Sequence, residues 1–186
     1  MVFEGNFFAL LRHMHFPGID MLHSIPTKVY NDAFTPKLVS SIAHAYGRPH
    51  VMSEVSAHAQ GGKVTPMQMY ASMSLQYALG VDTFTSYYSE QQAEPELYRQ
   101  LNQSLGRADA LMQGRHRANV MLYYPIETFQ MHHKGSAVFY GEYCAEENAC
   151  AEGLRSIFYG LLDRQIDFDF TDCEYLEKCH VRGGWL

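Results

Sequence analysis

The sequence predicts an α/β fold in which parallel strands alternate with helices. The same order of strand, loop and helix occurs at least twice, and the spacing from strand to strand is ~30 residues, as a βαβ unit requires. Each loop follows a strand, which predicts crossover connections between parallel strands. An open doubly wound sheet and a closed barrel both satisfy this pattern, and the pattern itself does not choose between them.

Five apolar runs predict the strands of this fold. The run at 50–54 contains Val51 and Met52, and Pro49 precedes it where no ladder N–H is needed. The run at 119–124 is continuously apolar, as expected for a strand buried on both faces, and the run at 166–170 alternates strictly. The predicted strands are 15–22, 50–54, 81–86, 119–124 and 166–170.

Helical spacing of apolar residues predicts the helices between these strands. Thr35 and Thr65 each precede a proline, so that the threonine caps the helix and the proline fills its first position. Gly47 and Gly80 follow the last helical residues, where a left-handed conformation is common. The predicted helices are 3–14, 35–46, 65–80, 95–113 and 151–163. The predicted loops are 23–34, 55–64 and 126–149, the last with His132, His133 and the acidic cluster Glu142, Glu146 and Glu147.

The composition excludes several classes of function. The chain has 186 residues, of which 47 % are apolar, and a net charge of −6. Its 14 Lys and Arg residues are scattered, so no nucleic-acid partner is predicted. No stretch of ~18 uncharged apolar residues predicts a membrane span. The first residues lack the pattern of a signal peptide, so a cytoplasmic location is the default, with a secreted or periplasmic parent as the alternative.

The four cysteines do not have the spacing of a common metal site. Cys144 and Cys150 form one C-x5-C pair, and Cys173 and Cys179 form another. Common zinc sites use narrower C-x2–4-C spacing, with histidines to match. The sequence therefore predicts no metal and no cofactor. Reduced thiols are expected, with disulfides in a secreted parent as the alternative.

Glu54 is the candidate catalytic residue. It is predicted at the point where the strand 50–54 gives way to a polar loop. In α/β folds, and above all in (β/α)8 barrels, the carboxyl ends of the strands carry the chemistry. The alternative is a solvated or salt-bridged glutamate at a strand end.

With these elements placed, the chain resembles the last quarter of a (β/α)8-barrel glycoside hydrolase. It is similar to the large multidomain, mostly bacterial family 106 rhamnosidases, and its layout is similar to that of the family 42 β-galactosidases, in which a barrel precedes an amidotransferase-like domain. The stretches that carry the resemblance are PGIDML (17–22), PKLVSSIAHAYGRPHVMSE (36–54), LGVDTFTSYYS (79–89), LMQGRHRANVMLYYP (111–125) and RQIDFDF (164–170).

The resemblance implies a domain organisation. Residues 1–114 would form barrel strands six to eight with their helices. Residues 115–186 would form the start of a Rossmann-like or flavodoxin-like, amidotransferase-like α/β domain. Both domains would be incomplete, so the chain is expected to be a fragment whose exposed apolar faces favour self-association.

The resemblance also implies site residues. Glu54 would be the strand-seven catalytic carboxylate, and its acid/base partner would come from strand four, outside this chain. Asp20 could hydrogen-bond a sugar hydroxyl, or instead cap a helix or order a loop. Tyr87 and Tyr88 could stack on a pyranose or hold the Glu54 carboxylate, or instead be ordinary packing residues. His58, in the loop after Glu54, would face the substrate or be an exposed loop histidine.

The sequence leaves three functions to consider. The first is a fragment of a glycoside hydrolase that cleaves O-glycosidic bonds of a plant or bacterial polysaccharide or oligosaccharide, inactive as an isolated chain. The second is a non-catalytic carbohydrate-binding or scaffold remnant of such a barrel. The third, a nucleotide-binding module, is disfavoured because no glycine-rich phosphate loop joins a strand to a helix.

Overall fold

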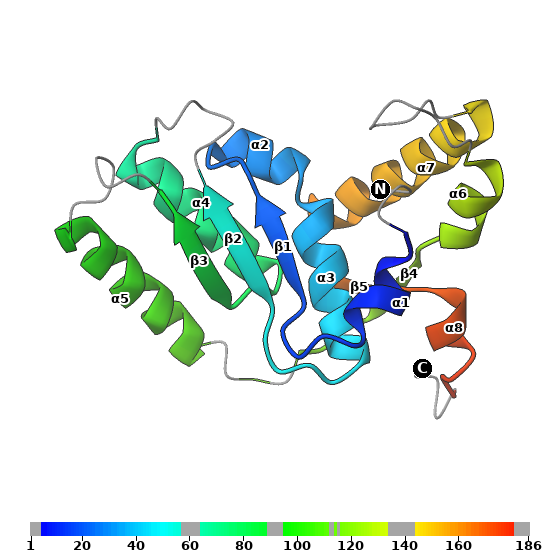
Figure 1. Cartoon of the computed structure of the whole chain (residues 1–186), viewed down its shortest axis with the longest axis horizontal. Coiled ribbons are helices and arrows are strands. Elements are labelled where there is room, and N and C mark those ends of the chain that lie inside the picture. Colours follow the sequence, from blue (N-terminus) through cyan, green and yellow to red (C-terminus); the bar gives the residue numbers. More distant parts are fainter. Residues whose placement is uncertain are drawn as a thin grey trace. The chain divides into compact units, whose positions relative to one another are not determined.

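The chain divides into two compact units (Figure 1). The computed structural model describes residues 5–56, 64–88, 95–111, 114, 116–133 and 144–180. One unit spans 14–116. The other combines 117–186 with the N-terminal residues 1–13, which the sequence analysis had placed with the barrel strands.

The unit 14–116 is built on a three-stranded parallel sheet in the order β1-β2-β3. Its strands are β1 (Gly18–Met21), β2 (Met52–Ser56) and β3 (Thr83–Tyr87). The predicted mixed α/β fold with parallel strands is therefore confirmed. Since β1 and β3 each pair with β2 and not with each other, the described residues show no closed barrel.

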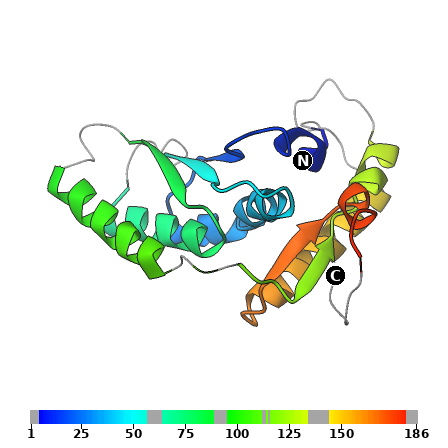
Figure 2. The ribbon, with the colours of Figure 1, turned by 90° about the horizontal axis from the view of Figure 1, so that it is seen from below.

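Helices cover one face of this sheet, as Figure 2 shows. The helices of the unit are α2 (Pro26–Asn31), α3 (Phe34–Ala45), α4 (Pro66–Ala78) and α5 (Pro95–Leu111). Met21 and Val55 point from the sheet into a buried cluster with Met69 and Met73 of α4 and Leu101 of α5. Successive right-handed crossovers between strands in simple order place all helices on one face, so the opposite face of the sheet carries none of them.

Two helix starts in the unit 14–116 differ from the sequence expectation. The segment 23–34 was predicted as a loop, but it contains α2, which begins with Pro26 at its first turn and buries Val29. Thr35 does not cap α3, because that helix already begins at Phe34 after Ala33. Phe34 and Ala33 are buried, so packing against the unit's core, not a side-chain cap, sets where this helix begins.

Other helix ends agree with their local signals. The Thr65 hydroxyl accepts the Gln68 N–H, and the Gln68 side chain accepts the Thr65 N–H, which completes a capping box at the start of α4. Gly80 follows this helix with φ +97°, and Gly47 follows α3 with φ +61°. Both glycines therefore occupy the left-handed conformation that the sequence predicted.

The second unit contains a two-stranded parallel sheet of β4 (Val120–Tyr123) and β5 (Phe168–Thr171). Its helices are α1 (Phe7–Leu11), α6 (Ile126–His132), α7 (Ala145–Leu162) and α8 (Cys173–Leu176). The sequence had predicted a longer first helix, 3–14, and had not predicted α8.

An aromatic core holds this second unit together. The buried Phe158 of α7 packs on Phe168 and Phe170 of β5, with ring centroids 5.4 and 5.9 Å apart. Phe8 of α1 packs on the buried Tyr124, with ring centroids 6.3 Å apart. Fully burying one such side chain is worth about 1.5–3 kcal/mol. These contacts explain why the N-terminal residues group with the C-terminal part of the chain.

The segment 126–149 is not the single long loop that the sequence predicted. Helix α6 begins at Ile126, which is buried, and α7 begins at Ala145, six residues before the predicted start at 151. Cys144 is the N-cap of α7: its sulfur accepts the Glu147 N–H, while the Glu147 carboxylate accepts the Cys144 N–H. Cysteine is not a residue that signals an N-cap in a sequence, so this helix start was missed.

None of the described helices combines the length and apolar character needed to cross a membrane.

Candidate functional site

The predicted catalytic residue, Glu54, lies on the sheet face that the helices leave uncovered. The sequence predicted Glu54 at the end of its strand. The strand extends to Ser56, so Glu54 lies in the middle of β2. Glu54 is two residues from the carboxyl end of β2, and ligands bind at the carboxyl ends of the strands in α/β folds. Glu54 is partly exposed, whereas Ser53 and Val55 on either side of it are fully buried.

Asp20 and Glu54 are neighbours across the sheet. The register pairs Asp20 of β1 with Glu54 of β2, and Glu54 in turn with Thr85 of β3. Residues in register on adjacent parallel strands point to the same face, and adjacent strands are about 4.8 Å apart. Three oxygen-bearing side chains therefore form a row across one polar face, and Asp20 and Thr85 at its ends are exposed.

The two candidate tyrosines point to opposite faces. Tyr87 follows Thr85 by two residues on β3, so it lies on the same face as Glu54, and it is 59 % exposed. Tyr88 instead packs against the buried cluster under the sheet. The Tyr88 hydroxyl forms a hydrogen bond with the Ser24 hydroxyl at 2.7 Å.

A buried hydrogen-bond chain joins the carboxyl ends of the strands. The Ser24 hydroxyl donates to the Ser56 carbonyl at 2.8 Å, so Tyr88 is the donor to Ser24. Burial raises the pKa of Tyr88, although its hydrogen bond with Ser24 opposes the shift. This chain fixes the ends of β1, β2 and β3 relative to one another, next to the face that carries Glu54.

A second set of buried hydrogen bonds joins β2 to helix α4. The Ser53 hydroxyl donates to the Gln76 side-chain carbonyl at 2.6 Å, and the Gln76 amide donates to the Ser72 hydroxyl at 3.3 Å. All three residues are fully buried. Because Ser53 precedes Glu54, this contact between β2 and α4 holds the backbone that carries the carboxylate.

The opposite end of the sheet has a structural cluster. Asp82 accepts hydrogen bonds from the Val51 N–H and the Thr83 hydroxyl, both at 3.0 Å, and its other oxygen lies 3.0 Å from His50 Nδ1. The His50 ring stacks on Phe16, with ring centroids 5.4 Å apart. These residues precede the strands and so lie at the edge of the sheet opposite to the carboxyl ends, where ligands bind in open α/β sheets.

The second unit has its own polar group at the carboxyl ends of β4 and β5. Glu127 accepts hydrogen bonds from the Cys173 thiol at 2.6 Å and from the Tyr123 hydroxyl at 2.9 Å. The hydrogen bond to Glu127, desolvation and nearby carboxylates, including Asp172, raise the pKa of Cys173 to about 11. Desolvation and the hydrogen bond to Glu127 raise the pKa of Tyr123 to about 12. The thiolate is the nucleophilic form of cysteine, and the Glu127 carboxylate beside Cys173 disfavours that form.

The structure brings some of the predicted site residues together and separates others. It places Asp20, Glu54 and Tyr87 on one face, and Tyr88 on the other. His58 lies outside the described residues. Sequence reasoning missed Ser24 and the neighbour Thr85, since neither carries a signal apart from its place after or within a strand.

Comparison with protein-family models, curated proteins and solved structures finds no match for the chain.

Proposed function

We propose that the chain is part of a (β/α)8-barrel glycoside hydrolase and that Glu54 is its strand-seven catalytic carboxylate. The observation that carries the proposal is the row of Asp20, Glu54 and Thr85 on a sheet face that no helix of the unit covers. In a barrel, this face points to the interior, and side chains near the carboxyl ends of the strands form the active site.

The row provides groups that a sugar requires. Carboxylate and hydroxyl oxygens accept and donate the hydrogen bonds that position sugar hydroxyls. Tyr87, on the same face and largely exposed, offers a ring surface for a pyranose. Asp20 then orients the sugar, while Glu54 either attacks the anomeric carbon or activates a water molecule.

Hydrolysis needs a second carboxyl group as the general acid. The two carboxyl groups are ~5.5 Å apart in retaining enzymes and ~6.5–9.5 Å apart in inverting ones. The resemblance assigns the acid to barrel strand four, and β1 to β3 would correspond to strands six to eight. The described strands therefore supply one half of the catalytic pair.

Glycosyl fluorides test this assignment, because fluoride departs without protonation and the general acid is not required. The chain is incubated with α- and β-fluorides of several hexoses and 6-deoxyhexoses, and fluoride release is measured with an ion-selective electrode. We expect at least one fluoride in the panel to be released faster than in buffer. Glu54→Gln should slow that release by ~100-fold or more, the usual contribution of a catalytic carboxylate.

Asp109→Asn is the matched control. It also removes one carboxylate, but from helix α5, where Asp109 accepts a hydrogen bond from Tyr77. This variant should release fluoride at the wild-type rate. Equal rates for wild type and Glu54→Gln, or no release from any sugar, would refute the catalytic role. Sugar binding by NMR titration without fluoride release would support the binding or scaffold remnant instead.

A further inference from the structure

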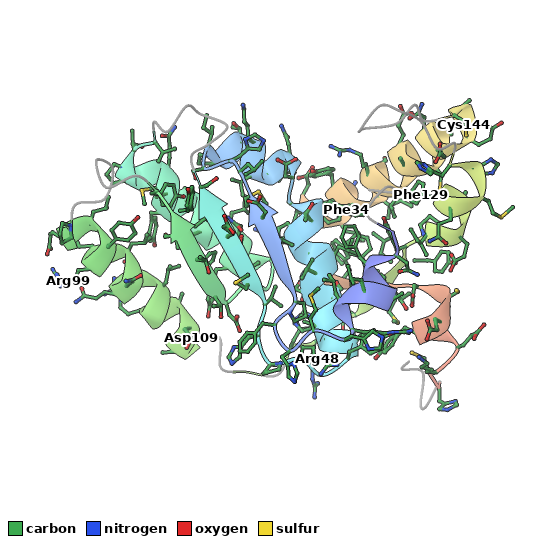
Figure 3. All side chains as sticks on the ribbon, viewed as in Figure 1. Phe34, Arg48, Arg99, Asp109, Phe129 and Cys144 are labelled. Carbon is green, nitrogen blue, oxygen red and sulfur yellow. The ribbon has the colours of Figure 1, made fainter. Side chains whose placement is uncertain are left out.

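Three metal-ligating side chains of the second unit meet between helices α6 and α7. They are His132 at the end of α6, Cys144 at the N-cap of α7 and Glu146 in its first turn. One ligand atom from each lies within 4.8 Å of the others. Figure 3 shows Cys144 at the start of α7, and Figure 1 shows α6 alongside that end of the helix.

A buried carboxylate borders this cluster, and among the described residues one of its oxygens has no hydrogen-bond donor. Glu147 is only 1 % exposed. Its Oε2 accepts the backbone N–H of Cys144 at 2.9 Å, which places the carboxylate directly beside a member of the cluster. Its Oε1 has no hydrogen bond within the part of the chain that the structure describes, and His133 Nδ1 is 4.0 Å away. A buried charged oxygen without a donor is costly unless a cation compensates it.

We propose that His132, Cys144 and Glu146 bind a zinc ion, with Glu147 as the buried carboxylate that supports the site. A donor set of one nitrogen, one sulfur and one oxygen suits Zn²⁺, which accepts all three. Ca²⁺ and Mg²⁺ require oxygen ligands and would not use the cysteine or the histidine. Three protein ligands leave a fourth tetrahedral position for water.

The geometry is close to what such a site requires. Zinc–ligand bonds of 2.0–2.3 Å imply ligand atoms roughly 3.5 Å apart in a tetrahedron. The observed limit of 4.8 Å exceeds this by about 1 Å, a gap that rotation of the exposed Glu146 side chain and of the imidazole can close. The bound ion would join the end of α6 to the start of α7.

The spacing of the cysteines did not predict this site, because common zinc motifs contain pairs of closely spaced cysteines. Here a single cysteine is used, together with a histidine twelve residues earlier and a glutamate two residues later. This spacing belongs to no common zinc motif, so only the packing of α6 against α7 reveals the cluster.

Cobalt and zinc titrations of the whole chain, first treated with a chelator, test the proposal. Isothermal titration calorimetry should give one Zn²⁺ per chain. Co²⁺, which occupies zinc sites and is coloured, should give a thiolate-to-cobalt charge-transfer band in the near ultraviolet. Cys144→Ser should abolish this band and weaken zinc binding by more than the ~10–100-fold typical for loss of an outer-shell partner. Serine is itself a preferred N-cap residue, so the start of α7 is preserved.

Cys150→Ser is the matched control, since it removes a thiol from the same helix but from outside the cluster. It should leave the cobalt band and the zinc affinity unchanged. Glu147→Gln retains an acceptor for the Cys144 N–H and should weaken zinc binding by ~10-fold through the lost charge.

Several results would overturn the proposal. They are the absence of zinc binding, tighter binding of Ca²⁺ than of Zn²⁺, a cobalt band that persists in Cys144→Ser, and a band that Cys150→Ser removes. Circular dichroism tests whether each variant is folded. If Cys144→Ser does not fold, His132→Gln replaces it, and unchanged zinc affinity in that variant would equally reject the site.

Discussion

The buried contact between Ser53 and Gln76 gives a quantitative test of how β2 is held under Glu54. Ser53→Ala removes the hydroxyl that donates to the Gln76 side-chain carbonyl at 2.6 Å, and Gln76 is fully buried. An acceptor left without its donor in the interior costs about 1–3 kcal/mol. We therefore expect Ser53→Ala to lower the free energy of unfolding by about 2 kcal/mol.

The double variant separates this polar penalty from simple loss of packing. Replacing both partners of a buried hydrogen bond by apolar groups of similar shape is nearly neutral. Gln76→Leu combined with Ser53→Ala should therefore be less destabilising than the sum of the two single changes. The expected coupling energy is ~1 kcal/mol or more, within the range found for residues in direct contact.

Urea unfolding followed by far-ultraviolet circular dichroism measures these differences. With a denaturant slope of about 1–3 kcal/mol/M, a loss of 2 kcal/mol moves the midpoint by ~1 M. The slope should stay constant between variants, so that the midpoint reports stability. A midpoint shift below ~0.3 M for Ser53→Ala, or strict additivity in the double variant, would show that the contact contributes little.

Two further predictions concern backbone strain and thiol chemistry. Gly80→Ala should be more destabilising than Gly47→Ala by at least ~1 kcal/mol in the same urea assay. Both glycines have positive φ, but only the Cβ added at position 80 would clash, because it would lie 2.6 Å from the Cβ of Ser40. Equal losses of stability in the two variants would contradict the packing argument. Glu127→Gln should lower the pKa of Cys173, which is raised to about 11 chiefly by the hydrogen bond to that carboxylate. Alkylation of Cys173 by iodoacetamide at pH ~8, followed by mass spectrometry of the peptide, should then be about tenfold faster or more. An unchanged alkylation rate would show that Glu127 does not control this thiol. Because the folded-state pKa of Cys173 lies above the ordinary 9.0, its contribution to stability should be complete below pH 9.0 and lost as the pH rises toward about 11.

The fold class could be predicted from local patterns. Apolar runs predicted the ends of each described strand to within three residues, and the Thr65 cap and Gly80 were identified from the sequence alone. These signals are local, because a strand needs only its own apolar run and a helix end needs only its own cap. The start of α7 was missed because its cap, Cys144, is chemically unusual, although its bonding follows the same geometry.

The site was only partly predictable. The sequence selected Glu54 and Asp20, and it did so through their positions near strand ends. It did not indicate that they are in register, because register depends on hydrogen bonds between strands that lie ~30 residues apart in the sequence. It also assigned Tyr87 and Tyr88 to one role, whereas strand alternation sends neighbouring side chains to opposite faces.

The sequence by itself therefore determined the α/β class, the parallel strands and the identity of the carboxylates, since each of these depends on residues close together in the chain. Only the tertiary structure decided which of those residues meet. The row of Asp20, Glu54 and Thr85 requires three strands to align. The cluster of His132, Cys144 and Glu146 requires α6 to pack beside the start of α7. Such meetings arise from the burial of distant apolar surfaces against one another, which no local pattern encodes.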